Sequence, residues 1–306
     1  MPPILHPRLR PLLPGITVAV ASLMWGAWWL PLRWLEAQGL AGDWSTVGLG
    51  SACSLILIVP LLRRRRRLAS QAWPLLAVGL LSGCGFAAWN HAILTGDVIR
   101  VTLLFYLAPV WGTLLAILFL GQRLTRWRAL SVVFGLAGAM VVLGSVIPVP
   151  HAGSEWMALG SGMSFAAAAA VIARIGTLGN VEKNFASLSG TALFGLVFLV
   201  GDRIGSGIAV APPSLGPSGL VALAALAAVM LVLQAMLLWG AGKLDSGRFT
   251  VLLLFEVISA TVTASLAMGA LPGWRESLGC LLILGCGLMD AIDQRQAGTV
   301  AAGGGA

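Results

Sequence analysis

The sequence predicts an all-α integral membrane protein with about ten transmembrane helices, arranged as two inverted five-helix repeats around a central cavity. Three observations lead to this fold class. Of the 306 residues, 58% are hydrophobic and only 10% are charged, whereas a soluble globular chain has roughly 25% charged residues. The mean hydropathy is +0.93. Apolar runs close to the ~20 residues needed to cross a bilayer recur along the chain. The third observation is an internal repeat.

The expected helices are apolar runs bounded by Gly, Pro or charged residues. In order they lie near 15–35, 45–62, 72–95, 98–120, 128–147, 154–177, 184–201, 217–242, 246–268 and 274–293. The run at 184–201 is the weakest, because a polar stretch precedes it and a Gly- and Pro-rich stretch follows. The first run resembles a signal peptide, but it continues as a full span, so we expect a membrane helix there.

The repeat appears when the chain is laid on itself with Trp89 on Trp239, a separation of 150 residues (239 − 89). The coincident pairs are Trp89 with Trp239, Phe105 with Phe255, Tyr106 with Glu256 and, after a shorter loop, Trp127 with Trp274. We therefore expect one five-helix repeat at 1–150, a second at 151–296 and a disordered tail at 297–306. Because five is odd, the second repeat must enter the membrane in the opposite sense.

Basic residues predict the orientation and the surroundings. With the N-terminus inside, only Arg33, Arg100, Arg203 and Arg275 of the 19 lysines and arginines fall at outer helix ends. By the positive-inside rule both termini are expected in the cytoplasm, in a bacterial-type inner membrane. The net charge of +8 includes five arginines, 63–67, directly after an apolar run. That position favours anionic lipid headgroups over nucleic acid as the partner.

No catalytic or cofactor motif is present. The sequence has no HExxH, no G-x-S-x-G, no Walker A and no paired intramembrane aspartates, and the four cysteines lack metal-site spacing. We therefore expect neither an enzyme nor a bound cofactor or metal. An ion channel is disfavoured because no filter sequence or ring of carboxylates appears. The oligomeric state is open, and a monomer is plausible.

Ionisable residues within apolar helices are the first site candidates. Glu256 lies about halfway along the run from Phe249 to Met268, where a charge is costly unless it faces the bundle interior or water. The repeat pairs it with Tyr106, the single tyrosine, which suits a site at the repeat interface. Asn90 and His91 are expected to contact substrate near the outer end of the third helix. The alternative for Glu256 and His91 is a satisfied structural group.

Deep aromatic residues and one proline complete the predicted site. Trp25, Trp111 and Phe165 are expected to line the cavity, although plain packing explains such residues equally well. Pro109 is expected to interrupt the fourth helix and serve as a hinge. The GxxxG spacing of Gly79 and Gly83 is expected to allow close helix packing.

Several motifs resemble the drug/metabolite transporter superfamily and its EamA-type members. They are Trp25-Gly26, Ala108-Pro109-Val110-Trp111, Leu118-Phe119-Leu120-Gly121-Gln122-Arg123-Leu124-Thr125 and Gly135-Leu136-Ala137-Gly138. The resemblance covers essentially the whole chain and implies ten helices in two inverted repeats. It also implies that His91, Tyr106 and Trp111 fall in the central cavity. The Trp-rich opening and Asn90-His91 are similar to the YddG-type amino acid exporters.

The chain departs from the family where members commonly have Glu after the Gly that ends the fourth helix. Gln122 stands there, and Ala270 stands at the counterpart after Gly269. A gating or coupling role of that acidic residue is therefore in doubt for this chain.

The sequence favours a secondary transporter that exports small amphipathic metabolites by alternating access, most of all amino acids, including aromatic ones. His91, Asn90 and indole N–H groups would meet a carboxylate, and Glu256 with aromatic faces would meet an ammonium group. The alternatives are an exporter of drugs or other metabolites with the same fold and a membrane-embedded enzyme using His91 and Glu256.

Overall fold

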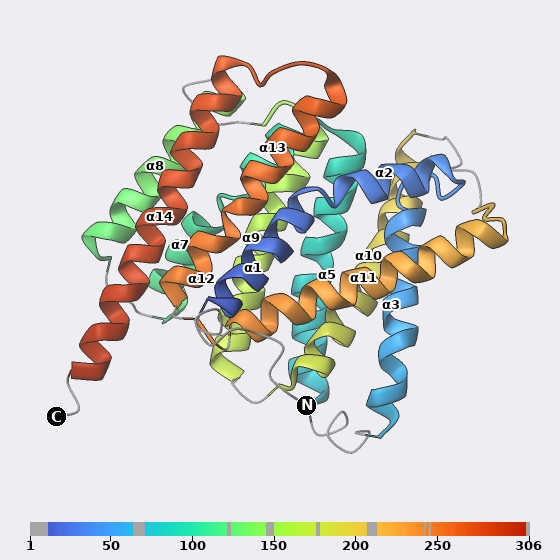
Figure 1. The fold of residues 1–306 in the computed structure, drawn as a ribbon, viewed down its shortest axis with the longest axis horizontal. Coiled ribbons are helices and arrows are strands. Elements are labelled where there is room, and N and C mark those ends of the chain that lie inside the picture. Colours follow the sequence, from blue (N-terminus) through green and yellow to red (C-terminus); the bar gives the residue numbers. More distant parts are fainter. Residues whose placement is uncertain are drawn as a thin grey trace.

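The computed structural model describes residues 12–63, 71–120, 124–144, 150–175, 178–206, 213–241, 243–244 and 246–303. Helices account for nearly all of these residues, and no strand occurs among them. The helices are α1 (Leu13–Gly26), α2 (Trp29–Ala37), α3 (Trp44–Leu62), α5 (Ala72–Thr95), α6 (Val98–Phe105), α7 (Ala108–Leu120), α8 (Arg126–Leu143), α9 (Gly153–Ile175), α10 (Asn180–Ser206), α11 (Pro217–Ala241), α12 (Ser246–Leu253), α13 (Phe255–Met268) and α14 (Trp274–Gly303) (Figure 1).

Eight segments of the described chain are long and apolar enough to cross a membrane. They are the α1–α2 pair, α3, α5, the α6–α7 pair, α9, α10, α11 and the α12–α13 pair. Helices α8 and α14 are outside this set and pack against each other at one side of the bundle (Figure 1). The prediction of an all-α membrane protein is confirmed.

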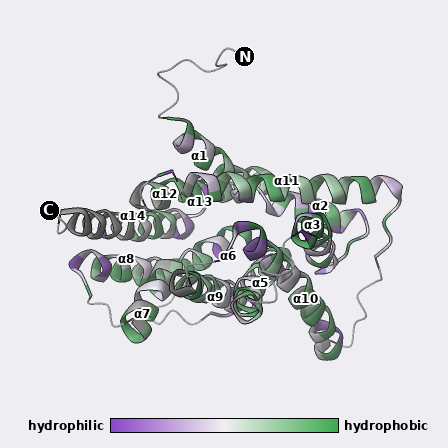
Figure 2. Cartoon of the chain, turned by 90° about the horizontal axis from the view of Figure 1, so that it is seen from below, coloured by the Kyte–Doolittle hydropathy of each residue, from purple (hydrophilic) through white to green (hydrophobic). Residues whose placement is uncertain are grey.

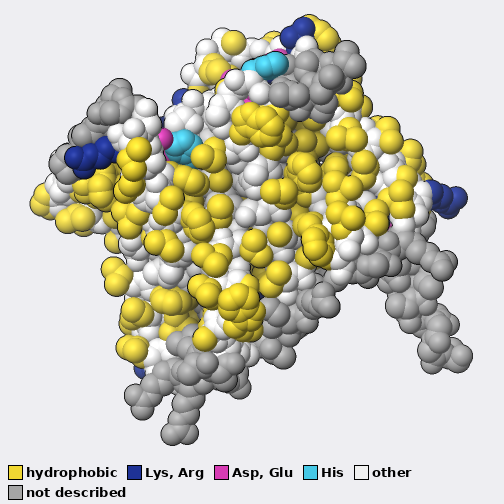
Figure 3. Space-filling view, turned by 180° about the vertical axis from the view of Figure 1, so that it is seen from behind, with side chains coloured by type: hydrophobic (Ala, Val, Ile, Leu, Met, Phe, Trp, Pro, Cys, Tyr) yellow, Lys and Arg dark blue, Asp and Glu magenta, His cyan; other side chains and the backbone are white. Residues whose placement is uncertain are grey.

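The outer surface is apolar, as a lipid-facing surface must be. Figure 3 shows hydrophobic side chains over most of one face, with the charged and His side chains in view toward its rim. Leu55, Val133, Val197 and Leu266 are each at least half exposed. Such side chains are favourable in hydrocarbon, whereas apolar patches of this extent are rare on soluble monomers.

The bundle has two ends, which we name by the chain. Helices α1 and α5 begin at the proximal face, which is the lower face in Figure 1, and α5 ends at the opposite, distal face. Helix α14 ends at the proximal face, so the described chain begins and ends on the same side (Figure 1).

Three membrane segments are broken near their middle. The α1–α2 pair breaks after Gly26, the α6–α7 pair after Phe105 and the α12–α13 pair at Leu254. A proline ring clashes with the carbonyl four residues earlier, and Pro31 and Pro109 follow the first two breaks at about that distance. The expected interruption of the fourth helix therefore lies ahead of Pro109. Pro109 itself occupies the first turn of α7, where its missing N–H costs little.

The contacts between helices repeat when the two halves are exchanged. Helix α5 packs on α9 and α10, and its counterpart α11 packs on α1 and α3. The α6–α7 pair contacts α9, as the α12–α13 pair contacts α1. Helix α3 corresponds to α10 and α8 corresponds to α14, so the contacts α3–α10 and α8–α14 are unchanged when the halves are exchanged. This exchange is the pattern that two structurally related halves produce, and the expected boundary at 150 falls between α8 and α9.

The helices form two layers. Viewed from the proximal side, α1, α11, α12 and α13 lie in one layer and α5, α7, α9 and α10 in the other (Figure 2). Contacts of α3 with both α10 and α11 join the layers at one side, and α8 with α14 joins them at the other. Any central cavity must therefore lie between α1, α11 and α13 on one side and α5 and α9 on the other.

Glycines hold α10 tightly against its neighbours. A Cβ on Gly83 would lie 2.5 Å from the Gly190 carbonyl carbon, and one on Gly79 would lie 2.9 Å from the Ala186 carbonyl oxygen. Both distances are too short for a real side chain, so the predicted packing role of Gly79 and Gly83 is confirmed. On the other side of α10, a Cβ on Gly50 would lie 2.8 Å from the Leu188 carbonyl oxygen. Helices α3, α5 and α10 thus form one closely packed unit.

Two expectations concern the ends and loops of the chain. Helix α14 continues to Gly303, so the segment 297–306, expected to be disordered, is helical as far as that residue. Of the five arginines at 63–67, residues 64–67 lie outside the described residues.

Candidate functional site: a cavity between the two layers

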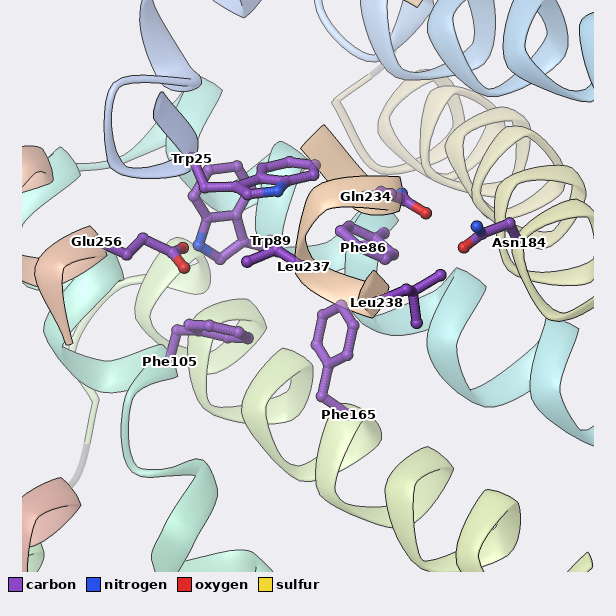
Figure 4. A pocket seen from close by; sticks show the side chains of 10 residues that line it. All are labelled: Trp25, Phe86, Trp89, Phe105, Phe165, Asn184, Gln234, Leu237, Leu238 and Glu256. Atoms are coloured by element: carbon purple, nitrogen blue, oxygen red, sulfur yellow. The ribbon is translucent and has the colours of Figure 1, made fainter. Parts of the chain in front are cut away.

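A cavity of about 280 Å³ lies between the layers. Its walls come from α1, α5, α6 and α9 to α11, together with the start of α13, so both halves contribute. The lining residues are Trp25, Phe86, Trp89, Phe105, Phe165, Asn184, Gln234, Leu237, Leu238 and Glu256 (Figure 4).

Four of the ten lining residues form a chain of aromatic rings in contact. Phe86 and Phe165 meet edge to face at 4.7 Å between ring centroids, and Phe105 and Phe165 do so at 5.5 Å. Trp25 joins this chain through Phe86 at 6.0 Å. Offset and edge-on ring pairs of this kind fix one another's positions. The cavity therefore has a preformed apolar surface suited to an apolar or aromatic group.

Glu256 supplies the carboxylate of the cavity, and the two helix breaks place it there. It is the second residue of α13, directly after the break at Leu254, and not the middle of a continuous helix as expected. The Tyr106 hydroxyl, at the break between α6 and α7, donates to Glu256 Oε2 at 2.7 Å and also lies 3.2 Å from the Leu253 carbonyl oxygen. The start of α13 favours a negative charge through its free N–H groups and dipole.

The contact between Tyr106 and Glu256 locates the site relative to the two halves of the chain. The repeat makes these two residues equivalent, and the structure brings them into direct contact across the interface of the halves. A pair of equivalent residues meets in this way only near the axis that relates the halves. The site therefore lies where inverted-repeat transporters are expected to bind substrate.

Several N–H donors of the cavity have no hydrogen-bond partner within the described protein. They are the indole Nε1 groups of Trp25 and Trp89 and the Nε2 amide of Gln234. Trp25 is 7%, Trp89 6% and Gln234 8% exposed. Buried donors are costly to leave unpaired. The cavity thus offers donors to an acceptor on a ligand, in addition to the Glu256 carboxylate.

The sequence-predicted residues divide into two groups. Trp25, Phe165 and Glu256 line the cavity, and Tyr106 bonds to Glu256. Asn90, His91 and Trp111 are not among the lining residues. Asn90 is 5% exposed, and Trp111 has a buried indole N–H without a partner on the half-buried face of α7. Their role in substrate contact stays a prediction.

His91 instead faces the distal junction of α3, α5 and α10. Its Nδ1 lies 2.7 Å from Asp43 Oδ2, and its ring packs 5.4 Å from that of Phe198. Burial raises the pKa of the Asp43 carboxyl above its ordinary value, while the hydrogen bond and the charge of His91 act in the opposite direction. The resemblance-based expectation of His91 in the cavity is therefore not met in this conformation.

The remaining lining residues were not predicted from the sequence: Phe86, Trp89, Phe105, Asn184, Gln234, Leu237 and Leu238. Gln234 had a usable signal, because it is a polar residue deep in the apolar run at 217–242. The two leucines had none, since nothing in a uniformly apolar helix marks which face meets the cavity.

The distal side of the cavity is closed and the proximal side approaches the surface. Asn184 lies near the proximal start of α10 and Leu238 near the proximal end of α11. Distal to the cavity, Trp28, Trp29 and Ile93 are almost fully buried. Trp29 Nε1 also donates to Thr263 Oγ1 at 3.0 Å, which ties α2 to α13. The structure therefore represents a state closed at the distal face.

Comparisons with known proteins agree with this architecture. Residues 13–144 match the profile of the EamA-like transporter family. A solved crystal structure is similar over 94% of this chain and 98% of its own chain, with a TM-score of 0.58 and 18% sequence identity, which shows a shared fold. No curated protein matches the chain. The family match to residues 13–144, together with the broken helices and the cavity between two exchangeable halves, supports a multi-pass membrane transporter of the drug/metabolite transporter type.

Proposed function

We propose that the protein transports amino acids with apolar or aromatic side chains, and that it exports them from the cytoplasm by alternating access. One observation carries the substrate class: the cavity combines a carboxylate, unpaired N–H donors and a wall of aromatic rings. A zwitterion with an apolar side chain needs these three partners.

Each part of such a substrate has a partner of matching chemistry. The ammonium group would bind Glu256 and the faces of neighbouring rings. The carboxylate would accept from the indole groups of Trp25 and Trp89 and from Gln234. The side chain would fill the space beside Phe86 and Phe165. The roles first expected for Asn90 and His91 thus fall to other donors in this conformation.

The size of the cavity favours a small substrate over a large drug. At about 280 Å³ it lies at the lower limit of small-molecule sites, which span ~300–1,000 Å³. Among the lining residues there is no Lys or Arg, which disfavours phosphorylated substrates. A multidrug role would require the cavity to enlarge in another state of the transport cycle.

The enzyme alternative has no support from the described contacts. It requires His91 and Glu256 to act on one substrate within about 3 Å. His91 bonds to Asp43 and Glu256 bonds to Tyr106, each at 2.7 Å. The family match to transporters points in the same direction.

The test is a competition assay with purified protein in liposomes. Labelled phenylalanine uptake is measured against unlabelled phenylalanine, its amide, its deaminated acid and its decarboxylated amine. Only the intact zwitterion should compete strongly, and each single-group analogue should be at least about tenfold weaker, a loss of about 1.4 kcal/mol. Equal competition by all four compounds, or no phenylalanine transport at all, would rule the proposal out.

A further inference from the structure

A second cluster of polar side chains lies outside the transport cavity, at the distal face. It consists of Asp43, which immediately precedes α3, His91 of α5 and Asp202 of α10. One potential ligand atom from each residue lies within 4.8 Å of the other two. The three residues are far apart in the sequence, so no spacing motif could reveal them.

The packing of the helices creates this cluster. Helix α5 meets α10 through Gly79 with Ala186 and Gly83 with Gly190, and the same offset of 107 residues (190 − 83) brings His91 to Phe198. Asp202 follows one turn later on α10. On the other side, the close approach of α3 to α10 at Gly50 carries Asp43 to the same end. A closely packed scaffold therefore holds the three side chains.

One carboxylate oxygen of this cluster, on Asp43, is buried and has no partner among the described residues. Asp43 is 2% exposed, and its Oδ1 atom has no hydrogen-bond partner in the described protein. Its other oxygen, Oδ2, bonds to His91. A buried carboxylate oxygen without a partner is expensive. Within the described part of the protein, no Lys or Arg forms an ion pair with Asp43.

We propose that Asp43, His91 and Asp202 form a binding site for a divalent transition-metal ion of the Zn²⁺ type. One imidazole and two carboxylates are ligands that such ions accept, with water as the fourth ligand. Zn–N and Zn–O bonds of about 2.0–2.2 Å place neighbouring ligand atoms roughly 3.3 Å apart. The distance between His91 Nδ1 and Asp43 Oδ2, 2.7 Å, would therefore have to increase by about half an ångström when both atoms bind the ion.

The position of the site gives the metal a structural effect. Asp43 and His91 belong to the first half of the chain and Asp202 to the second. A bound ion would therefore connect the two halves at the face that is closed in this state. Because the ion binds the folded protein alone, it should raise the melting temperature in a concentration-dependent way.

The experiment uses the full-length protein, purified in detergent with an affinity tag that contains no histidine and stripped of metal with a chelator. Zn²⁺ is titrated calorimetrically, and Co²⁺ is titrated while its visible absorption is recorded. We expect one ion per chain, a raised melting temperature and a Co²⁺ spectrum of four-coordinate type. His91→Ala should weaken binding at least about 100-fold, because even outer-shell partners of metals are typically worth 10–100-fold.

Two further variants make the result decisive. His151→Ala removes an exposed histidine close to the distal start of α9 and should bind Zn²⁺ as the wild type does. Asp202→Asn changes an exposed side chain, so it should fold normally and still lose affinity. If His91→Ala and His151→Ala bind Zn²⁺ equally, or if the wild type shows no saturable binding, the three residues form only an ion-paired cluster. Neither result depends on which substrate the cavity transports.

Discussion

At the scale of single residues, the site is defined by contrast with its surroundings. Glu256 and Tyr106 are polar groups at two helix breaks; Glu256 lines a largely apolar cavity, and the Tyr106 hydroxyl donates to its carboxylate. The sequence marked both residues, because a carboxylate in an apolar run and a single tyrosine at its repeat position stand out without any structure. Gln234 was equally visible in principle. Leu237 and Leu238 were not, since the face that a leucine presents depends on the crossing of helices.

Glu256→Gln should weaken amino acid binding at least about tenfold, because the amide keeps the shape but cannot attract an ammonium group. Binding of the deaminated acid should change much less. Competition for labelled phenylalanine in liposomes measures both effects. The matched control is Glu276→Gln, which alters a carboxylate in the first turn of α14, outside the cavity lining. Equal loss in both variants would mean that Glu256 only supports the fold.

Gln234→Leu should have the complementary effect. It removes a buried amide donor without a protein partner, at nearly constant volume. Recognition of the substrate carboxylate should fall by about tenfold, as expected for one hydrogen bond to a charged group. Amide or ester analogues of the substrate should be affected less. If Gln234→Leu instead improves stability and leaves selectivity unchanged, the amide has no role in binding.

At the scale of elements, composition predicted which segments are helices but not where they break. Pro31 and Pro109 are sequence signals for two of the breaks, whereas no proline follows the break at Leu254 at a similar distance. The breaks matter because half-helix ends bring backbone polar groups to the repeat interface. His91 shows the same limit. Its place on the third helix was clear from the sequence, but the face it occupies depends on the pairing of α5 with α10.

The tight contact of α5 with α10 should not tolerate a side chain. Gly83→Val places atoms where the Gly190 backbone already lies, and overpacking of this kind typically costs 1–3 kcal/mol. We expect a lower melting temperature in detergent and reduced yield. Gly160→Ala is the control, because a Cβ there meets nothing within 4 Å. A fully stable Gly83→Val protein would show that α5 and α10 separate more easily than the structure implies.

At the scale of the whole molecule, the exchange of helix contacts between the halves explains why a transporter of this kind can have two states. In one state the two halves adopt different arrangements. In the other state they exchange these arrangements, and the site at their interface then faces the opposite side of the membrane. The sequence predicted the repeat from a few aromatic coincidences. It could not predict which state is favoured, because that depends on small differences between the distal contacts, such as Trp29 with Thr263, and the proximal ones.

The orientation of the protein in the membrane can be tested directly. Arg33, Arg100, Arg203 and Arg275 lie on helix segments that end or begin at the distal face, as the charge count predicts. The other described basic residues, among them Lys243, lie near proximal helix ends. By the positive-inside rule we expect the distal face to lie outside the cell.

Single cysteines introduced into a cysteine-free background test this assignment. Ser277→Cys lies exposed at the distal start of α14, and Lys243→Cys lies exposed between the proximal ends of α11 and α12. A membrane-impermeant maleimide added to intact cells should label the first variant. It should label the second only after the membrane is permeabilised, because the bilayer then no longer separates the reagent from the proximal face. The reverse labelling pattern would mean that the proximal face lies outside the cell. The distally closed state would then open toward the outside, contrary to the proposed orientation.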